Sequence, residues 1–311
     1  MAGDKRDPAS KRRMKMGLLD KLLGKSDGIS KVDHTFVKVV RALDNGEEWA
    51  KKEINQMYQN NNPYLTDKMC RARIEIYSDA AYAGNPEAQY WLGYSLQYYN
   101  PEESFRLLKN LADKGSIRAM KAIAMCYTEY GGYGEDDDKY KYWYMKAAEA
   151  GDAEAQYTIG LEYRCDENLT EAEYWYKLSA SQKYSKGLLE YAKLLDYKRM
   201  RPEYVNRQSD DEIFQIEDLL LEALNTAKNK DEFADAASEI SHFYYMCCIG
   251  NDGPLNSENT IKRAAYFAWV SYLDGENVHM KKHFDRIINE YNIYVNTSDI
   301  EQWAKDEKLF E

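Results

Sequence analysis

Two segments of the chain nearly repeat one another, and this internal similarity constrains the fold more than any other feature. The first is AYAGNPEAQYWLGYSL, from Ala81 to Leu96, and the second is AEAGDAEAQYTIGLEY, from Ala148 to Tyr163. Such self-similarity is typical of proteins built from stacked supersecondary units. We therefore predict an all-α fold, a right-handed superhelix (α-solenoid) of stacked helix pairs. These folds bind partners along an extended surface, which favours an interaction module over an enzyme.

A glycine closes each strong unit, and a residue suited to starting a helix follows it. Gly84, Gly115 and Gly151 recur at spacings of 31 and 36 residues, and Lys183 occupies the next equivalent position. Glycine adopts the left-handed conformation that ends a helix, and Asn, Ser or Asp in the next position can cap the following helix. Small and large apolar residues then share one helical face. These pairs are Ala88 with Leu92, Ala119 with Ile123, Ala155 with Ile159, and Gly187 with Tyr191.

A small residue follows each large apolar landmark and allows two helices to approach closely; these residues are Gly93, Ala124, Gly160 and Ala192. A longer pattern runs through the first strong repeats. The pattern comprises Leu92, Gly93, Tyr127, Gly132, Gly134, Asp136, Lys139, Trp143, Tyr144, Ala147, Ala148 and Gly151. It resembles the Sel-1-like repeat family, a relative of the tetratricopeptide repeats. The resemblance is clear from Ala80 to about Leu195 and fades on both sides. It implies a non-enzymatic scaffold or adaptor that binds a protein or peptide in the concave groove of a solenoid.

The chain divides into five predicted segments around these repeats. They are a basic leader with a short amphipathic stretch (1–30), capping helices and an opening unit (31–83), strong repeats (84–195), a connector with degenerate repeats (196–275), and C-terminal capping helices (276–311). The opening unit pairs a helix over Glu47–Gln59 with one over Thr66–Ala83. The connector extends from Asp196 to Asp211, and the last helix is expected over Ser298–Lys308.

Charge and cysteine usage limit the partners and the compartment. The formal net charge is −11, so phosphate backbones are repelled on average and nucleic acid is not an expected partner. The same charge favours a basic protein or peptide as the partner. The five cysteines are odd in number and form no CxxC pair, which predicts buried free thiols in a reducing cytoplasm. We therefore expect a cytoplasmic protein of bacterial type. The oligomeric state is not encoded in any pattern that we recognise.

The N-terminal leucines allow two interpretations. Leu18, Leu19, Leu22 and Leu23 share one face of a short helix with lysines beside it. A basic amphipathic helix of this kind can lie on an anionic membrane surface, which would make the protein a peripheral membrane scaffold. Alternatively, the leucines pack on the first repeat as a cap behind a flexible leader.

Catalytic, metal and cofactor chemistry has little support in the sequence. His279 and His283 have a metal-like i, i+4 spacing but lack companion ligands, so we assign them a structural role. The acidic run Asp136–Asp138 lacks the pattern of an EF-hand and is interpreted as a helix start. Some members of the Sel-1-like family are described as β-lactamases, but no Ser-x-x-Lys motif occurs here. We predict no enzymatic activity, no bound metal and no cofactor, with a β-lactamase-like hydrolase as the third hypothesis.

Tyrosine is abundant, with 28 residues in 311, and part of this excess is assigned to a binding surface. If the first helix of each pair lines the concave face, its exposed positions lie at fixed offsets from the large apolar landmark. Tyrosine, methionine and arginine at such positions supply much of the binding energy of interfaces. For each tyrosine the alternative is packing against a neighbouring repeat. The predicted groove residues are Tyr90, Tyr94, Tyr98, Lys121, Met125, Glu129, Tyr157, Leu161, Arg164, Leu189, Lys193, Tyr197, His242 and Tyr245.

Overall fold

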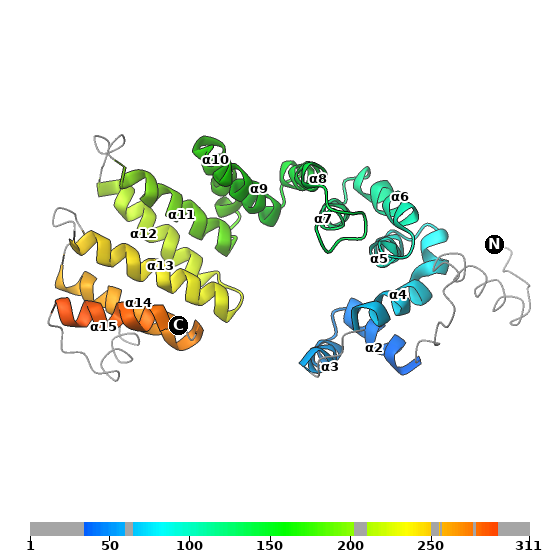
Figure 1. The fold of residues 1–311 in the computed structure, drawn as a ribbon, viewed down its shortest axis with the longest axis horizontal. Helices are drawn as coiled ribbons and strands as arrows, with labels where there is room; N and C mark the ends of the chain where they lie inside the picture. Colours follow the sequence, from blue (N-terminus) through cyan, green and yellow to red (C-terminus); the bar gives the residue numbers. More distant parts are fainter. Residues whose placement is uncertain are drawn as a thin grey trace, which may run out of the picture. The chain divides into compact units, whose positions relative to one another are not determined.

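The computed structural model describes residues 34–59, 65–201, 210–249, 255, 257–275 and 278–291. Within these ranges the regular elements are all α-helices, labelled α2 to α15 in Figure 1. The prediction of an all-α fold is therefore confirmed. The chain forms two compact units, Met1–Ala150 and Gly151–Glu311, which are described separately.

The first unit contains seven described helices that pack in chain order from α4 onwards. Their bounds are α2 (His34–Asp44), α3 (Glu48–Gln59), α4 (Leu65–Tyr82), α5 (Pro86–Leu96), α6 (Pro101–Ala112), α7 (Ile117–Met125) and α8 (Asp137–Glu149). One predicted pairing is wrong: α4 packs mainly against α2 and α5, whereas α3 contributes Ala50, Ile54 and the partly buried Met57 to the core that α2 and α4 share.

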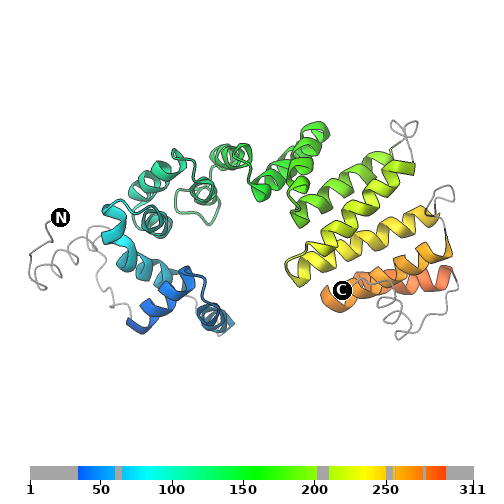
Figure 2. The ribbon, with the colours of Figure 1, turned by 180° about the vertical axis from the view of Figure 1, so that it is seen from behind.

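The second unit also contains seven described helices, and each packs against the next (Figure 2). Their bounds are α9 (Ala153–Cys165), α10 (Leu169–Ser181), α11 (Ser185–Arg199), α12 (Asp210–Asn225), α13 (Lys230–Ile249), α14 (Glu258–Gly275) and α15 (Val278–Glu290). Helix α11 continues to Arg199, so the predicted connector begins later than Asp196. The last predicted helix, Ser298–Lys308, lies outside the described residues.

The predicted stop and start signals are present between the helices. Gly84, Gly115 and Gly151 have φ angles of 93°, 89° and 93°, and Lys183 adopts the same left-handed region at 58°. Each glycine is followed by a side chain that accepts a hydrogen bond from the first turn of the next helix, as Asp152 does from the Ala155 amide at 2.8 Å. Asp136 caps α8 in the same way, which confirms that the acidic run there starts a helix.

Two glycines inside helices permit close packing within repeat units. An added Cβ at Gly160 in α9 would lie 2.5 Å from the Cδ1 atom of Tyr176 in α10, whose side chain is fully buried. An added Cβ at Gly93 in α5 would lie 2.9 Å from the Cγ atom of Leu108 in α6, a somewhat longer distance. Both contacts confirm that small residues at these positions bring neighbouring helices together.

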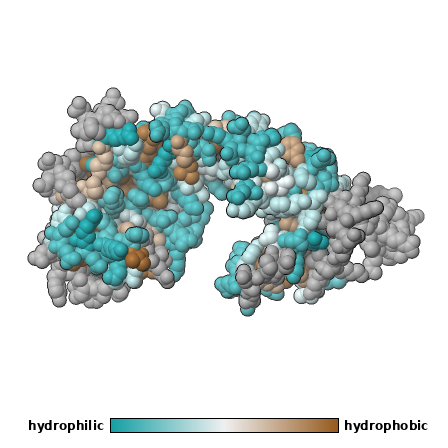
Figure 3. All heavy atoms as spheres, in the orientation of Figure 1, coloured by the Kyte–Doolittle hydropathy of each residue, from teal (hydrophilic) through white to brown (hydrophobic). Residues whose placement is uncertain are grey.

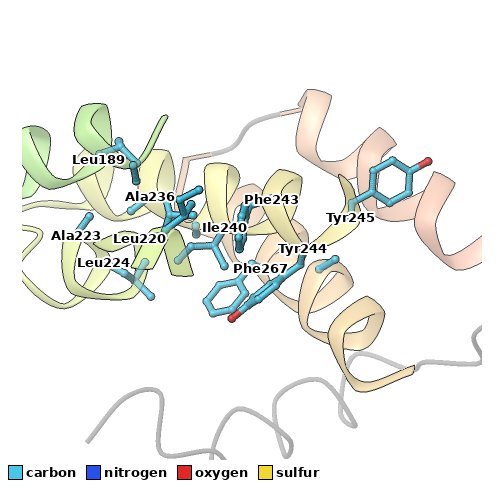
Figure 4. Close-up of a cluster of buried hydrophobic side chains, with 14 of the residues drawn as sticks. Leu189, Leu220, Ala223, Leu224, Ala236, Ile240, Phe243, Tyr244, Tyr245 and Phe267 are labelled. Atoms are coloured by element: carbon cyan, nitrogen blue, oxygen red, sulfur yellow. The ribbon is translucent and has the colours of Figure 1, made fainter. Parts of the chain in front are cut away.

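The largest core lies in the second unit and joins α10 to α15. Figure 4 shows Ile240, Phe243 and Tyr244 of α13 gathered with Phe267 of α14, while Tyr245 points away from this group toward α15. The Tyr245 hydroxyl contacts the Glu290 carboxylate on α15. The face of α13 that carries Tyr245 is therefore occupied by the last described helix.

The five cysteines are free, and Cys70, Cys126, Cys247 and Cys248 are buried as predicted. Cys165, at the end of α9, is exposed, so the prediction of a buried thiol is wrong for this residue. None of the described helices is both long and apolar enough to cross a membrane.

Candidate functional site

The strongest candidate site is a pair of adjoining hollows in the second unit, between α11 and α13. The side chains that line them recur every three or four residues along both helices, so one face of each helix forms the site. From α11 these are Ser185, Lys186, Leu189, Glu190, Ala192, Lys193, Asp196, Tyr197 and Met200; from α13 they are Glu232, Asp235, Ser238, Glu239, His242, Phe243 and Met246. We call this surface the α11–α13 groove.

The two hollows follow one another in the same direction along both helices. The first involves residues 185–193 of α11 and 232–239 of α13, and the second involves residues 192–200 and 239–246. Helices α11 and α13 therefore run parallel, as first helices of successive pairs must when a second helix, here α12, returns the chain. Lys193 and Glu239 line both hollows, and their side chains lie 3.7 Å apart.

The first hollow, of about 270 Å³, is rich in carboxylates, and we call it the acidic hollow. Lys193 donates to Glu190 at 2.8 Å, and Arg164 also contacts Glu190. Burial opposes the charge of Lys193, but its hydrogen bond to Glu190 and the charges of Glu190 and Glu239 outweigh this and raise its pKa. Glu190 and Glu239 are thus compensated by cations of the protein itself.

Two further carboxylates of the acidic hollow remain uncompensated. Within the described part of the chain, neither Glu232 nor Asp235 forms an ion pair, although one oxygen of Glu232 accepts a hydrogen bond from the Lys228 amide at 3.0 Å. Tyr157 of α9 closes this end of the hollow, and its ring packs against Tyr184 with centroids 5.8 Å apart. Burial, followed by the charge of Glu190, raises the pKa of the Tyr157 hydroxyl, which therefore stays a neutral donor.

The second hollow, of about 370 Å³, is lined mainly by apolar side chains, and we call it the apolar hollow. Ile216 and Leu220 of α12 line it together with Phe243 and Met246 of α13. Tyr197 and Met200, which also line it, are each 45% exposed. Figure 3 shows apolar residues scattered among hydrophilic ones over α11 and α12.

Five of the predicted groove residues line these hollows, namely Tyr157, Leu189, Lys193, Tyr197 and His242. Leu189 nevertheless has only 8% of its surface exposed, and Tyr245 has 4%, so the exposure expected at these two positions is not observed. Leu189 packs into the unit 2 core, and Tyr245 contacts α15. Of the other predictions in this unit, Leu161 is partly buried against the core and Arg164 contacts Glu190.

The sequence reasoning missed several lining residues, including Glu190, Glu232, Asp235, Met200 and the apolar pair from α12. Continuing the i, i+3, i+4 pattern from Leu189 would have found Met200 on the same face. The acidic residues of α13 required knowledge that α13 lies beside α11, which no local pattern provides.

The predicted groove residues of the first unit lie on α5, on α7 and in the segments that follow these two helices. Tyr90 stacks on Tyr94 with centroids 6.2 Å apart, and the Arg118 guanidinium lies 3.7 Å from the Tyr90 ring centre. Arg118 also forms an ion pair with Glu87 at 2.9 Å. The Tyr90 side chain therefore packs against a neighbouring repeat, which is the alternative given above for each tyrosine.

Several of the other predicted residues of this unit are more open. Tyr98 is 54% exposed and its hydroxyl donates to the Tyr130 carbonyl oxygen, while Met125 is 48% exposed. Lys121 is half-buried and Glu129 is exposed.

A buried ion pair stabilises the start of the first unit. Arg73 of α4 donates to Asp44 of α2 at 2.6 Å, and their side chains are 9% and 1% exposed. The same guanidinium lies 4.3 Å from the ring centre of Trp91 on α5. One cation therefore joins three helices.

The two histidines of the predicted pair differ, because His283 packs against aromatic rings whereas His279 is exposed. His283 lies 5.1 Å from the ring of Tyr245 and 6.4 Å from that of His242, measured between centroids. Burial, together with the charge of Arg286, lowers the pKa of His283 to about 4. Among the described residues, no group of three or more His, Cys, Asp and Glu side chains is arranged to hold a metal ion. Leu18, Leu19, Leu22 and Leu23 lie outside the described residues, so the membrane-surface interpretation stays a prediction.

Comparison with known proteins adds two distant structural likenesses. No family model and no curated protein sequence matches the chain. A Sel1 repeat protein from Oxalobacter formigenes is 16% identical, with a TM-score of 0.47 over 92% of this chain and 94% of its own. A protective antigen of uropathogenic Escherichia coli strains, which displays an SLR fold, is 18% identical, with a TM-score of 0.40 over 91% of this chain and 66% of its own. The first carries the name of the family that the repeat motif resembles.

Proposed function

We propose that the protein is a non-enzymatic interaction module that binds a peptide or an extended segment of a protein in the α11–α13 groove. The observation that carries the proposal is the continuity of the two hollows, which share Lys193 and Glu239 and follow the parallel helices α11 and α13. A continuous surface with changing chemistry along its length suits a chain that lies along it. An isolated pocket would suit a single small ligand better.

The composition of the groove also supports a protein partner. Tyr197 and Met200 at the rim are large, half-exposed side chains next to a recess formed by Ile216, Leu220 and Phe243. Aromatic residues and methionine at the centre of an interface supply large contact areas, and the pocket between them can accept one anchoring side chain. Methionine adapts its shape to different partners, which suits a scaffold.

Selection of binding peptides on the full-length protein tests this proposal. A phage-displayed random peptide library is selected on the wild-type chain, and the affinities of the enriched peptides are measured for three variants. Tyr197→Ala removes a groove side chain, whereas Tyr174→Ala is the matched control, because Tyr174 on α10 is 55% exposed and lines neither hollow. A Tyr90→Ala/Tyr94→Ala variant reports on the surface of the first unit.

The proposal predicts that Tyr197→Ala weakens the enriched peptides at least fivefold and that the Tyr174→Ala control binds like wild type. Loss of affinity in the Tyr90→Ala/Tyr94→Ala variant alone would move the site to the first unit and contradict the proposal. Cytoplasmic location, bacterial origin and the absence of catalysis remain predictions from the sequence.

A further inference from the structure

We infer that the α11–α13 groove recognises a segment with two features at a set spacing, a basic side chain and, about three to five residues away, a large apolar side chain. This inference rests on the proposed function and specifies the chemistry of the partner. The basic side chain would occupy the acidic hollow near Glu232 and Asp235, and the apolar side chain would occupy the apolar hollow.

Charge complementarity supports the basic half of the inference. Glu190 and Glu239 already have cationic partners in Arg164 and Lys193, so they contribute little further attraction. Glu232 and Asp235 have no ion-pair partner in the described part of the chain, and both line the same recess. An arginine or lysine of a partner would supply the missing counter-charge there. The net charge of −11 adds long-range attraction for such a partner.

A cation already in the acidic hollow limits this attraction. Lys186 lines the same recess, and no ion pair of its side chain is found among the described residues. An acidic partner would meet Lys186 but also the two unpaired carboxylates and the paired Glu190 and Glu239. The balance in this hollow therefore favours a basic group, and the preference should weaken when Asp235 is neutralised.

The lining of the apolar hollow defines the second feature. Ile216, Leu220, Phe243 and Met246 offer hydrocarbon and thioether surface. The charged Lys193, Asp196 and Glu239 of the same hollow already have ion-pair partners, so a large apolar side chain gains more there than a polar one, which would lose its hydration. A leucine, methionine or phenylalanine side chain of the bound segment can fill this recess. Tyr197 at the rim can cover the inserted side chain.

The helix geometry sets the separation between the two features. Equivalent positions in the two hollows are seven residues apart on each helix, for example Asp235 and His242 on α13, whereas Asp235 and the apolar Met246 are eleven apart. An α-helix rises about 1.5 Å per residue, so the two features are separated by about 10 to 16 Å. An extended chain advances about 3.3 Å per residue and therefore covers this distance in about three to five residues.

Fluorescence anisotropy with designed peptides and the full-length protein tests the inference. The reference probe is a fluorescein-labelled peptide with one arginine, three serines and then one phenylalanine. In one comparison peptide the arginine is replaced by glutamate, in a second the serines are removed so that the two features are adjacent, and in a third serine replaces the phenylalanine. Titrations at about 50 and 200 mM salt separate the electrostatic part of binding.

The inference predicts that the reference peptide binds at least tenfold more tightly than each comparison peptide. Asp235→Asn should weaken the reference peptide about three- to tenfold and reduce its dependence on salt. The matched control is Asp218→Asn, which removes a charge from an exposed position on α12 outside both hollows and should bind like wild type. Circular dichroism of each variant verifies that the fold is retained.

Other outcomes would overturn the inference in distinguishable ways. If the four peptides bind equally and Tyr197→Ala weakens all of them, the groove is a binding site but the two-feature recognition is wrong. If Asp235→Asn has no more effect than Asp218→Asn, the acidic hollow does not select a basic group. If none of the four peptides binds and peptides selected from the library are insensitive to Tyr197→Ala, the proposed function fails together with the inference.

Discussion

Replacing Gly160 by alanine should destabilise the second unit, although alanine is the better helix former. The new Cβ would lie 2.5 Å from the Cδ1 atom and 2.6 Å from the Cε1 atom of Tyr176. These distances are about 1 Å shorter than a favourable contact between carbon atoms. The Tyr176 side chain is fully buried, so its ring cannot move into solvent.

The magnitude follows from two opposing terms. Overpacking a well-packed core costs about 1–3 kcal/mol, whereas replacing glycine by alanine inside a helix gains about 0.5–1 kcal/mol. We expect a net loss of about 1–2 kcal/mol in the free energy of unfolding. For a unit of this size the loss corresponds to a decrease in Tm of about 2–8 °C.

Thermal unfolding followed by circular dichroism measures the loss, and hydrogen exchange of the α9 and α10 amides shows where it occurs. Gly93→Ala provides a graded comparison with a smaller expected loss, because its Cβ would lie 2.9 Å from the flexible side chain of Leu108. Combining Gly160→Ala with Tyr176→Leu should cost less than the sum of the two single changes, since the clash is then removed. An unchanged or increased Tm for Gly160→Ala, with no coupling in the double variant, would refute the reasoning.

Three further predictions concern a buried charge, a thiol and a histidine. Asp44→Ala leaves its buried guanidinium partner unpaired and should lower the unfolding free energy of the first unit by about 3–5 kcal/mol in urea denaturation; a loss below 1 kcal/mol would contradict this. Iodoacetamide should alkylate the exposed Cys165 first, while burial raises the pKa of Cys126 to about 12 and keeps that thiol unreactive; mass spectrometry that finds Cys126 modified as fast would disprove it. Burial and the charge of Arg286 lower the pKa of His283 to about 4, so between pH 6.5 and 4 the unfolded chain binds a proton that the folded protein does not. Stability should therefore fall as the pH is lowered from 6.5 to 4, and it should fall less steeply in His283→Gln. Identical pH profiles of the wild-type protein and this variant would exclude the effect.

Local signals allowed much of the fold to be predicted. The glycine stops, the polar caps and the small–large apolar pairs depend on residues within one or two helical turns, so they can be recognised without knowing the neighbours. Lys183 shows a limit of this reasoning, because it adopts the left-handed conformation that a glycine adopts at the equivalent position of the other repeats. Its position in the repeat, and not its residue type, revealed the turn.

The proposed binding surface was harder to predict because it depends on which helices become neighbours. Fixed offsets within a repeat selected Tyr157, Lys193 and Tyr197, which line the two hollows. The same rule failed for Tyr245, since α15 covers that face of α13. Asp235 was missed because its importance arises only from the proximity of α13 to α11, two helices separated in sequence by α12.

Methyl NMR of the full-length protein, with its methionines labelled with carbon-13, tests the central claim most directly. Met200 and Met246 line the apolar hollow, whereas the exposed Met125 lies in the first unit and serves as an internal control. Our account predicts that a bound peptide shifts the Met200 and Met246 signals and leaves the Met125 signal unchanged. A shift of Met125 with no change at Met200 and Met246 would show that the α11–α13 groove is not the binding site.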